Sequence, residues 1–75
     1  MTGEERLGLA RALIAEHQQA PEDDHAPLAL ESLVLVLVAE GLEARAGIRV
    51  AARDVVPENF GSIARIAAYL AKRGA

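Results

Sequence analysis

The chain has 75 residues, 52% of them hydrophobic, and its 8 basic and 11 acidic side chains leave a formal net charge of −3 at pH 7. This length allows one small domain, residues 1–75, with too little interior for a buried catalytic cleft, and the apolar content excludes a disordered tail. The acidic balance, with no basic stripe, argues against a nucleic-acid partner, and the absence of cysteine excludes disulfides and thiolate metal sites.

No apolar run approaches the roughly 18 residues that a membrane span needs, and the segment after Met1 is polar. We therefore expect a cytoplasmic monomer without membrane contact. Phe60 and Tyr69 are the only aromatic residues, so the core should be aliphatic and rich in alanine. That composition favours an all-α fold.

The first predicted helix extends to about His17. Thr2 and Glu5 have the spacing of a capping box at its start. Within the helix, apolar side chains recur at steps of three and four at Leu7, Ala10, Leu13 and Ile14.

A long loop is predicted over 18–31, where two prolines and an acidic run break this helical pattern. Leu28 and Leu30 are expected to hold this loop against the core.

The second predicted element contains seven consecutive apolar residues over 33–39, which also suit a buried strand. A helix over Ser32–Ala46 is favoured, because an apolar stripe continues beyond residue 39 and no second strand-like run offers a pairing partner. Ser32 is predicted to be its N-cap and Gly47 its left-handed C-cap. The stripe consists of Leu35, Val38, Ala39, Leu42 and Ala46.

The opposite side of this helix is apolar as well, and a contiguous apolar patch on a small protein usually marks a contact surface. The alternative is that another element of the same chain covers part of it. The residues on or near this side are Leu33, Val34, Val36 and Leu37.

Two shorter elements follow. A single helical turn is predicted around Asp54–Val56, with Pro57 preventing a long helix. Ser62 is the expected N-cap of a last helix. The prediction is thus a small four-helix bundle with three longer helices and one short one. The last helix is indicated by apolar residues at helical spacing, namely Ile63, Ile66, Ala67 and Leu70.

No combination of residues indicates catalysis, and we expect no enzymatic activity. Ser32 and Ser62 have no base at a recognisable spacing and lie in no Gly-x-Ser-x-Gly turn. Ser32 has a second possible role, because the free N–H groups of a first helical turn would favour a phosphate ester on its hydroxyl. Four polar residues in or beside the loop match no metal-ligand template and are interpreted as solvated groups, namely His17, Asp23, Asp24 and His25.

From Leu28 onwards the sequence resembles an acyl carrier protein. The signature of that family is Asp-Ser-Leu at the start of the second helix, with a leucine four residues before the serine, and Leu28, Ser32 and Leu33 match it. The order of predicted elements also matches that family: a long helix, a long loop, a helix that begins at the serine, a short turn and a last helix. Further matches lie at Gly47-Ile48, Pro57-Glu58-Asn59-Phe60 and Ala68-Tyr69-Leu70.

The resemblance implies a function. Ser32 would accept 4'-phosphopantetheine from coenzyme A through a phosphopantetheinyl transferase. The thiol of that arm would hold an acyl or aminoacyl group as a thioester, for loading and processing enzymes of fatty-acid, polyketide or nonribosomal-peptide pathways. The competing hypothesis is a small helical protein-interaction domain, in which Ser32 is only a helix N-cap and the apolar patch binds a partner or a second copy.

Two features depart from the family. Glu31 stands in the place of its aspartate, and Val34 and Leu37 stand where many members carry acidic residues on the partner-facing side. We therefore expect partners to dock mainly by apolar contact, with a reduced electrostatic contribution from the remaining acidic residues. The residues expected to contact partners are Glu31, Leu33, Val34, Val36, Leu37 and Glu40.

Overall fold

The computed structural model describes residues 1–75 and contains helices but no strands. This confirms the predicted all-α class with three longer helices, and two short helical elements stand where one was predicted. No helix has both the length and the apolar character that crossing a bilayer requires. The elements are α1 (Gly3–Ala15), α2 (Ser32–Ala46), the 3-10 helix η1 (Ala52–Asp54), α3 (Pro57–Phe60) and α4 (Ile63–Lys72).

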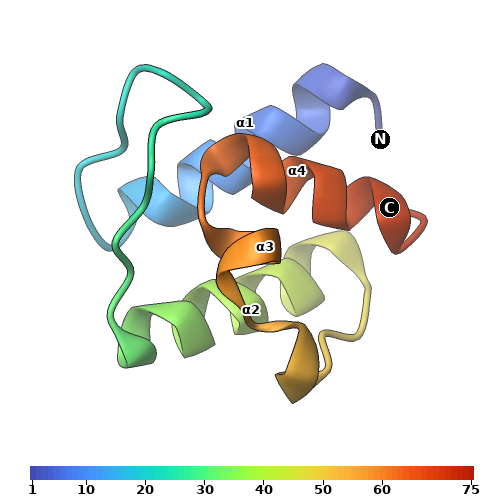
Figure 1. The fold of residues 1–75 in the computed structure, drawn as a ribbon. Helices are drawn as coiled ribbons and strands as arrows, with labels where there is room; N and C mark the ends of the chain where they lie inside the picture. Colours follow the sequence, from blue (N-terminus) through green and yellow to red (C-terminus); the bar gives the residue numbers. More distant parts are fainter.

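The helices surround one core, which is mainly aliphatic but also contains Phe60 and Tyr69. α1 lies along α4, α2 runs beneath this pair, and α3 lies between α2 and α4 (Figure 1). The two chain ends lie on the same side of the molecule, where the Arg6 Nε donates a hydrogen bond to the Ala75 carbonyl oxygen at 2.8 Å. The fully buried core side chains of largest volume are Leu13, Ile14, Val38, Leu42, Phe60, Ile63, Ile66 and Leu70.

Helix α1 begins as its sequence predicts and ends slightly earlier. The Glu5 N–H donates to the Thr2 hydroxyl at 3.1 Å, and the Thr2 N–H donates to the Glu5 carboxylate at 2.7 Å, which completes the capping box. The last helical residue is Ala15, two residues before the expected end near His17. Residues 15–17 are all exposed, so extending the helix would bury nothing further.

Helix α2 has the predicted bounds and the predicted buried stripe. Val38 and Leu42 are completely buried, and the other stripe residues pack against the core. Gly47 ends the helix at φ 68°, a left-handed conformation that favours glycine. A Cβ on Gly41 would lie 2.5 Å from the Leu13 Cδ2, so a glycine at this position lets α2 come close to α1.

The predicted helical turn at Asp54–Val56 is wrong, because helical turns lie on either side of Val55 and Val56. The 3-10 helix η1 ends at Asp54, and α3 begins at Pro57. The N–H of the first helical residue has no partner within the helix, so the missing N–H of proline costs nothing at that position, and its fixed φ suits it. Pro57 therefore starts a short helix. Val56 is extended, as a residue before proline usually is.

Helix α4 confirms the sequence-based prediction. The Ser62 hydroxyl accepts a hydrogen bond from the Arg65 N–H at 3.1 Å, and Ser62 itself is buried. The Tyr69 ring packs against Phe60 with ring centroids 5.7 Å apart, which joins α4 to α3. The buried residues of α4 are Ile63, Ile66, Ala67, Tyr69 and Leu70.

Candidate functional site

Ser32 is the first helical residue of α2, and its side chain is exposed. The N-cap is Glu31, whose extended backbone (φ −70°, ψ 157°) precedes the helix, and no side chain caps this end. The prediction that Ser32 is the N-cap is therefore wrong by one position. The Ser32 hydroxyl has no hydrogen-bond partner in the protein, so stabilising the helix end does not explain its presence.

The start of α2 presents free backbone donors. The first backbone hydrogen bond there runs from the Leu35 N–H to the Glu31 carbonyl oxygen at 2.9 Å, so the N–H groups of residues 32–34 have no helical partner. Helices α1 and α4, by contrast, have side-chain caps from Thr2 and Ser62. These donors and the positive end of the helix dipole favour a negatively charged group on Ser32.

The segment before Ser32 is held in place by backbone and apolar contacts. The Leu28 N–H donates to the Gly61 carbonyl oxygen at 2.8 Å. Leu28 and Leu30 pack against the core, as predicted. Two ordered anchors within four residues of Ser32 fix the direction in which the chain enters α2. A small cavity of about 90 Å³ lies beside this segment, lined by Leu28, Leu30, Leu35, Pro57, Phe60 and Gly61.

Arg11 of α1 holds the first half of the same loop. Its guanidinium donates to the Pro21 carbonyl oxygen at 2.6 Å, to the Glu22 carbonyl oxygen at 3.1 Å and to the Asp24 carboxylate at 2.6 Å. The Asp24 carbonyl oxygen accepts from the Ala64 N–H of α4 at 2.8 Å. This loop is thus joined to both α1 and α4. The acidic run and the basic residue in the preceding helix were the only sequence signals for this anchor.

An exposed apolar face lies next to Ser32 on α2. Leu33 is 69% exposed, Val36 51% and Leu37 37%, and we call these three residues the α2 apolar face. Val34 differs from the expectation, because it is half-buried and packs against the core. Glu40 is exposed one turn beyond Leu37.

A hollow of about 350 Å³ lies between α2 and the segment that leads to α3. It begins about 6 Å along the helix axis from Ser32, at Val36, since each helical residue rises about 1.5 Å. Five of its seven lining residues are hydrophobic, and two carboxylates lie among them. The lining consists of Val36, Ala39, Glu40, Glu43, Val50, Ala52 and Val55.

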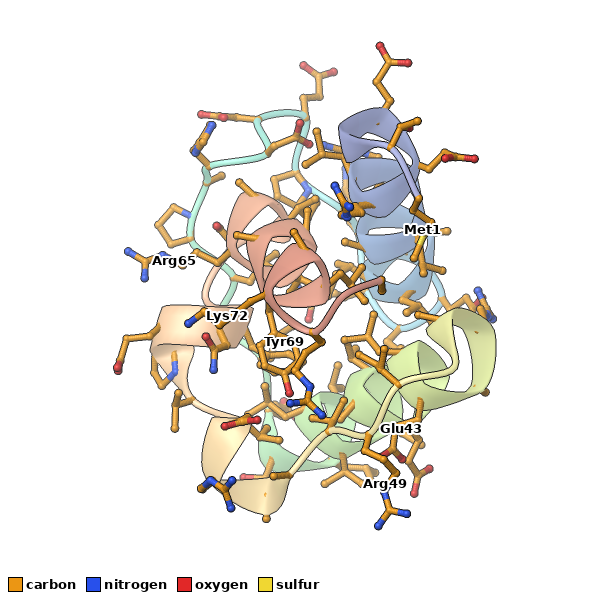
Figure 2. The ribbon with its side chains drawn as sticks, turned by 90° about the vertical axis from the view of Figure 1, so that its right-hand side faces the viewer. Met1, Glu43, Arg49, Arg65, Tyr69 and Lys72 are labelled. Atoms are coloured by element: carbon orange, nitrogen blue, oxygen red, sulfur yellow. The ribbon has the colours of Figure 1, made fainter.

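Three side chains tie down the far wall of this hollow. The Glu43 carboxylate accepts from the Val50 N–H at 2.8 Å, and the Asn59 amide donates to the Asp54 carbonyl oxygen at 2.8 Å. The Tyr69 hydroxyl donates to the Asp54 carboxylate at 2.9 Å; Figure 2 shows Tyr69 on α4 and Glu43 on α2. Burial, and then the hydrogen bond to Asp54, raise the pKa of Tyr69 above its ordinary value of 10.0.

The polar loop residues do not gather into a site. His17 and His25 are both exposed, and nowhere in the chain do three or more histidine, cysteine, aspartate or glutamate side chains converge to hold a metal ion. The residues that lie together are Ser32, the free N–H groups at the start of α2, and the α2 apolar face.

No protein-family model, curated protein or solved structure matches this chain.

Proposed function

We propose that the protein is a carrier that holds acyl or aminoacyl groups on a phosphopantetheine arm attached to Ser32. The observation that carries the proposal is that Ser32 is exposed and its hydroxyl makes no hydrogen bond within the protein, at a helix N-terminus that no side chain caps. An attachment point needs a hydroxyl that an enzyme can reach.

The residues around Ser32 fit a phosphodiester. The free N–H groups of the first turn of α2 and the helix dipole would stabilise its negative charge. Glu31 opposes this attraction, but its side chain makes no hydrogen bond that directs it towards Ser32. When attached, the group supplies a thiol that carries the cargo as a thioester, which suits a chain that has no cysteine of its own.

The surroundings of Ser32 support the carrier role in two further ways. The loop before Ser32 is anchored through Leu28, so the attachment point is held on a rigid base. The hollow beside α2 provides an apolar wall within about 6 Å of Ser32 along the helix axis, and an apolar cargo gains from such a surface. The partners proposed are a phosphopantetheinyl transferase and the enzymes that load and process the cargo, in fatty-acid or secondary-metabolite biosynthesis.

A second candidate is a small helical interaction domain, which the exposed α2 apolar face favours. In that case Ser32 would have no chemical role. It would also lack the N-cap role expected of it under this candidate, because Glu31 is the N-cap. The two candidates differ in what happens to the hydroxyl of Ser32.

Incubation with coenzyme A and a broad-specificity phosphopantetheinyl transferase tests the proposal. The intact mass of the native chain should rise by one phosphopantetheine, and Ser32→Ala should abolish the increase. Unchanged mass with several transferases would count against the carrier and favour the interaction domain.

A further inference from the structure

We infer that the cargo carried at Ser32 is an aminoacyl group, whose ammonium is held by Glu40 and Glu43 in the hollow beside α2. The inference rests on the proposed function, because it names the class of cargo that the arm would carry. The hollow combines apolar walls with negative charge. Five of its lining residues are hydrophobic, the other two are these glutamates, and no basic side chain is among them.

Neither carboxylate of the hollow has a cationic partner in the protein. The two ion pairs of the chain use the side chains of Asp24 and Glu16 instead. Arg49, the neighbour of Val50 in sequence, points away from the rest of the molecule (Figure 2). The Glu43 carboxylate accepts one hydrogen bond, from the Val50 N–H, and an ionised carboxylate has about four acceptor positions. Both negative charges are therefore free to bind a cation that enters the hollow.

The spacing of the two glutamates favours a positively charged ligand over a neutral one. They are three residues apart on one helix, which places their Cβ atoms about 5–6 Å apart. Like charges at this spacing repel each other, and an ammonium between them would remove that repulsion. A neutral acyl chain would instead take water away from both carboxylates and supply no partner for them. The hollow therefore suits a cargo with an apolar body and a positive charge.

The position of the glutamates along α2 matches the reach of the arm. Glu40 is about 12 Å and Glu43 about 17 Å from Ser32 along the helix axis, since each residue rises about 1.5 Å. The phosphopantetheine arm is about as long as four extended residues, or roughly 14 Å. An aminoacyl thioester has its α-amino group beside the carbonyl carbon, and such groups are mainly protonated at neutral pH. The ammonium can thus reach the two carboxylates while an apolar side chain contacts Val50 and Val55.

Two free esters, titrated into the unmodified chain at about pH 6.5, test this specificity without the arm. Leucine methyl ester and methyl 4-methylpentanoate differ only in the ammonium, and ligands of this size bind in the millimolar range. Backbone amide NMR signals over residues 36–43 and 50–55 should shift, with the leucine ester binding at least about fivefold tighter than the uncharged ester. Glu40→Gln should reduce this preference at least about threefold. Glu4→Gln, the same change of charge at an exposed position of α1, is the matched control and should leave the preference unchanged.

Glu43→Gln provides a second variant, because a glutamine oxygen can still accept from the Val50 N–H and keep the wall of the hollow in place. It should also reduce the preference for the leucine ester. Equal affinity for the two esters would overturn the inference and leave the carrier function intact. So would a preference that survives both substitutions, or the absence of a saturable shift in residues 36–43 at millimolar ester. Failure of Ser32 to be modified contradicts the proposed function instead, whatever the esters do.

Discussion

Replacing Leu42 by alanine tests which side of α2 is buried, and Leu33→Ala is its matched control. The two residues are nine positions apart, which places them on opposite sides of a helix with about 100° per residue. Leu42 is completely buried, whereas Leu33 is 69% exposed. The same chemical change on one helix therefore removes core packing in one variant and only surface area in the other.

The expected difference is large. Removing a buried leucine side chain costs about 2–5 kcal/mol, because transfer free energy is lost and a cavity remains. A chain of this length has a total stability of about 4–11 kcal/mol, so Leu42→Ala should remove about a fifth or more of it. We expect Leu33→Ala to change the free energy of unfolding by no more than about 0.5 kcal/mol.

Urea and thermal unfolding, followed by circular dichroism at 222 nm, measure both variants. Leu42→Ala should lower the midpoint temperature by at least about 10 °C, and Leu33→Ala should move it by no more than a few degrees. Equal losses in the two variants, or a larger loss for Leu33→Ala, would refute the orientation of α2 and with it the exposed apolar face.

Three further predictions concern the contacts that support the fold. Ser62→Ala removes the cap of α4 and should cost about 0.5–2 kcal/mol in urea unfolding; no loss would show that the cap is dispensable. Arg11→Ala should speed amide hydrogen exchange over residues 20–26, because it removes the contacts that hold this loop to α1. It should lower global stability by only about 1 kcal/mol or less, because the ion pair with Asp24 is partly exposed. Unchanged exchange would contradict the role of Arg11 as the loop anchor. The pKa of Tyr69 is raised in the folded chain, so the contribution of its neutral hydroxyl to stability is complete below about pH 10 and is lost as the pH rises further. Urea titrations from about pH 8 to 11 should show this loss in the native chain, and Tyr69→Phe should abolish it.

The faces of the long helices could be predicted from the sequence because burial follows local spacing. The stripe containing Val38 and Leu42 is buried, and four of the five buried residues of α4 were predicted, Tyr69 being the exception. The capping box of Thr2 and the cap formed by Ser62 were predictable for the same reason, since the partner of each lies three residues away.

Features that depend on a single backbone torsion or on distant residues were not predictable in the same way. Glu31 and Ser32 both occupy the junction before α2, and only the extended backbone of Glu31 shows which of them is the N-cap. Pro57 breaks a helix from within but suits its first position, so its effect depends on where α3 begins. The contacts of Arg11 join residues 10 to 13 positions apart, beyond the reach of helical periodicity.

The location of a phosphopantetheine adduct tests the carrier function most directly. The chain has only two serines, Ser32 and Ser62, and the second is 4% exposed and occupied in capping α4. After incubation with coenzyme A and a transferase, tandem mass spectrometry of proteolytic peptides should locate one adduct on Ser32 and none on Ser62. Absence of the adduct from Ser32 in the folded chain would contradict the carrier function.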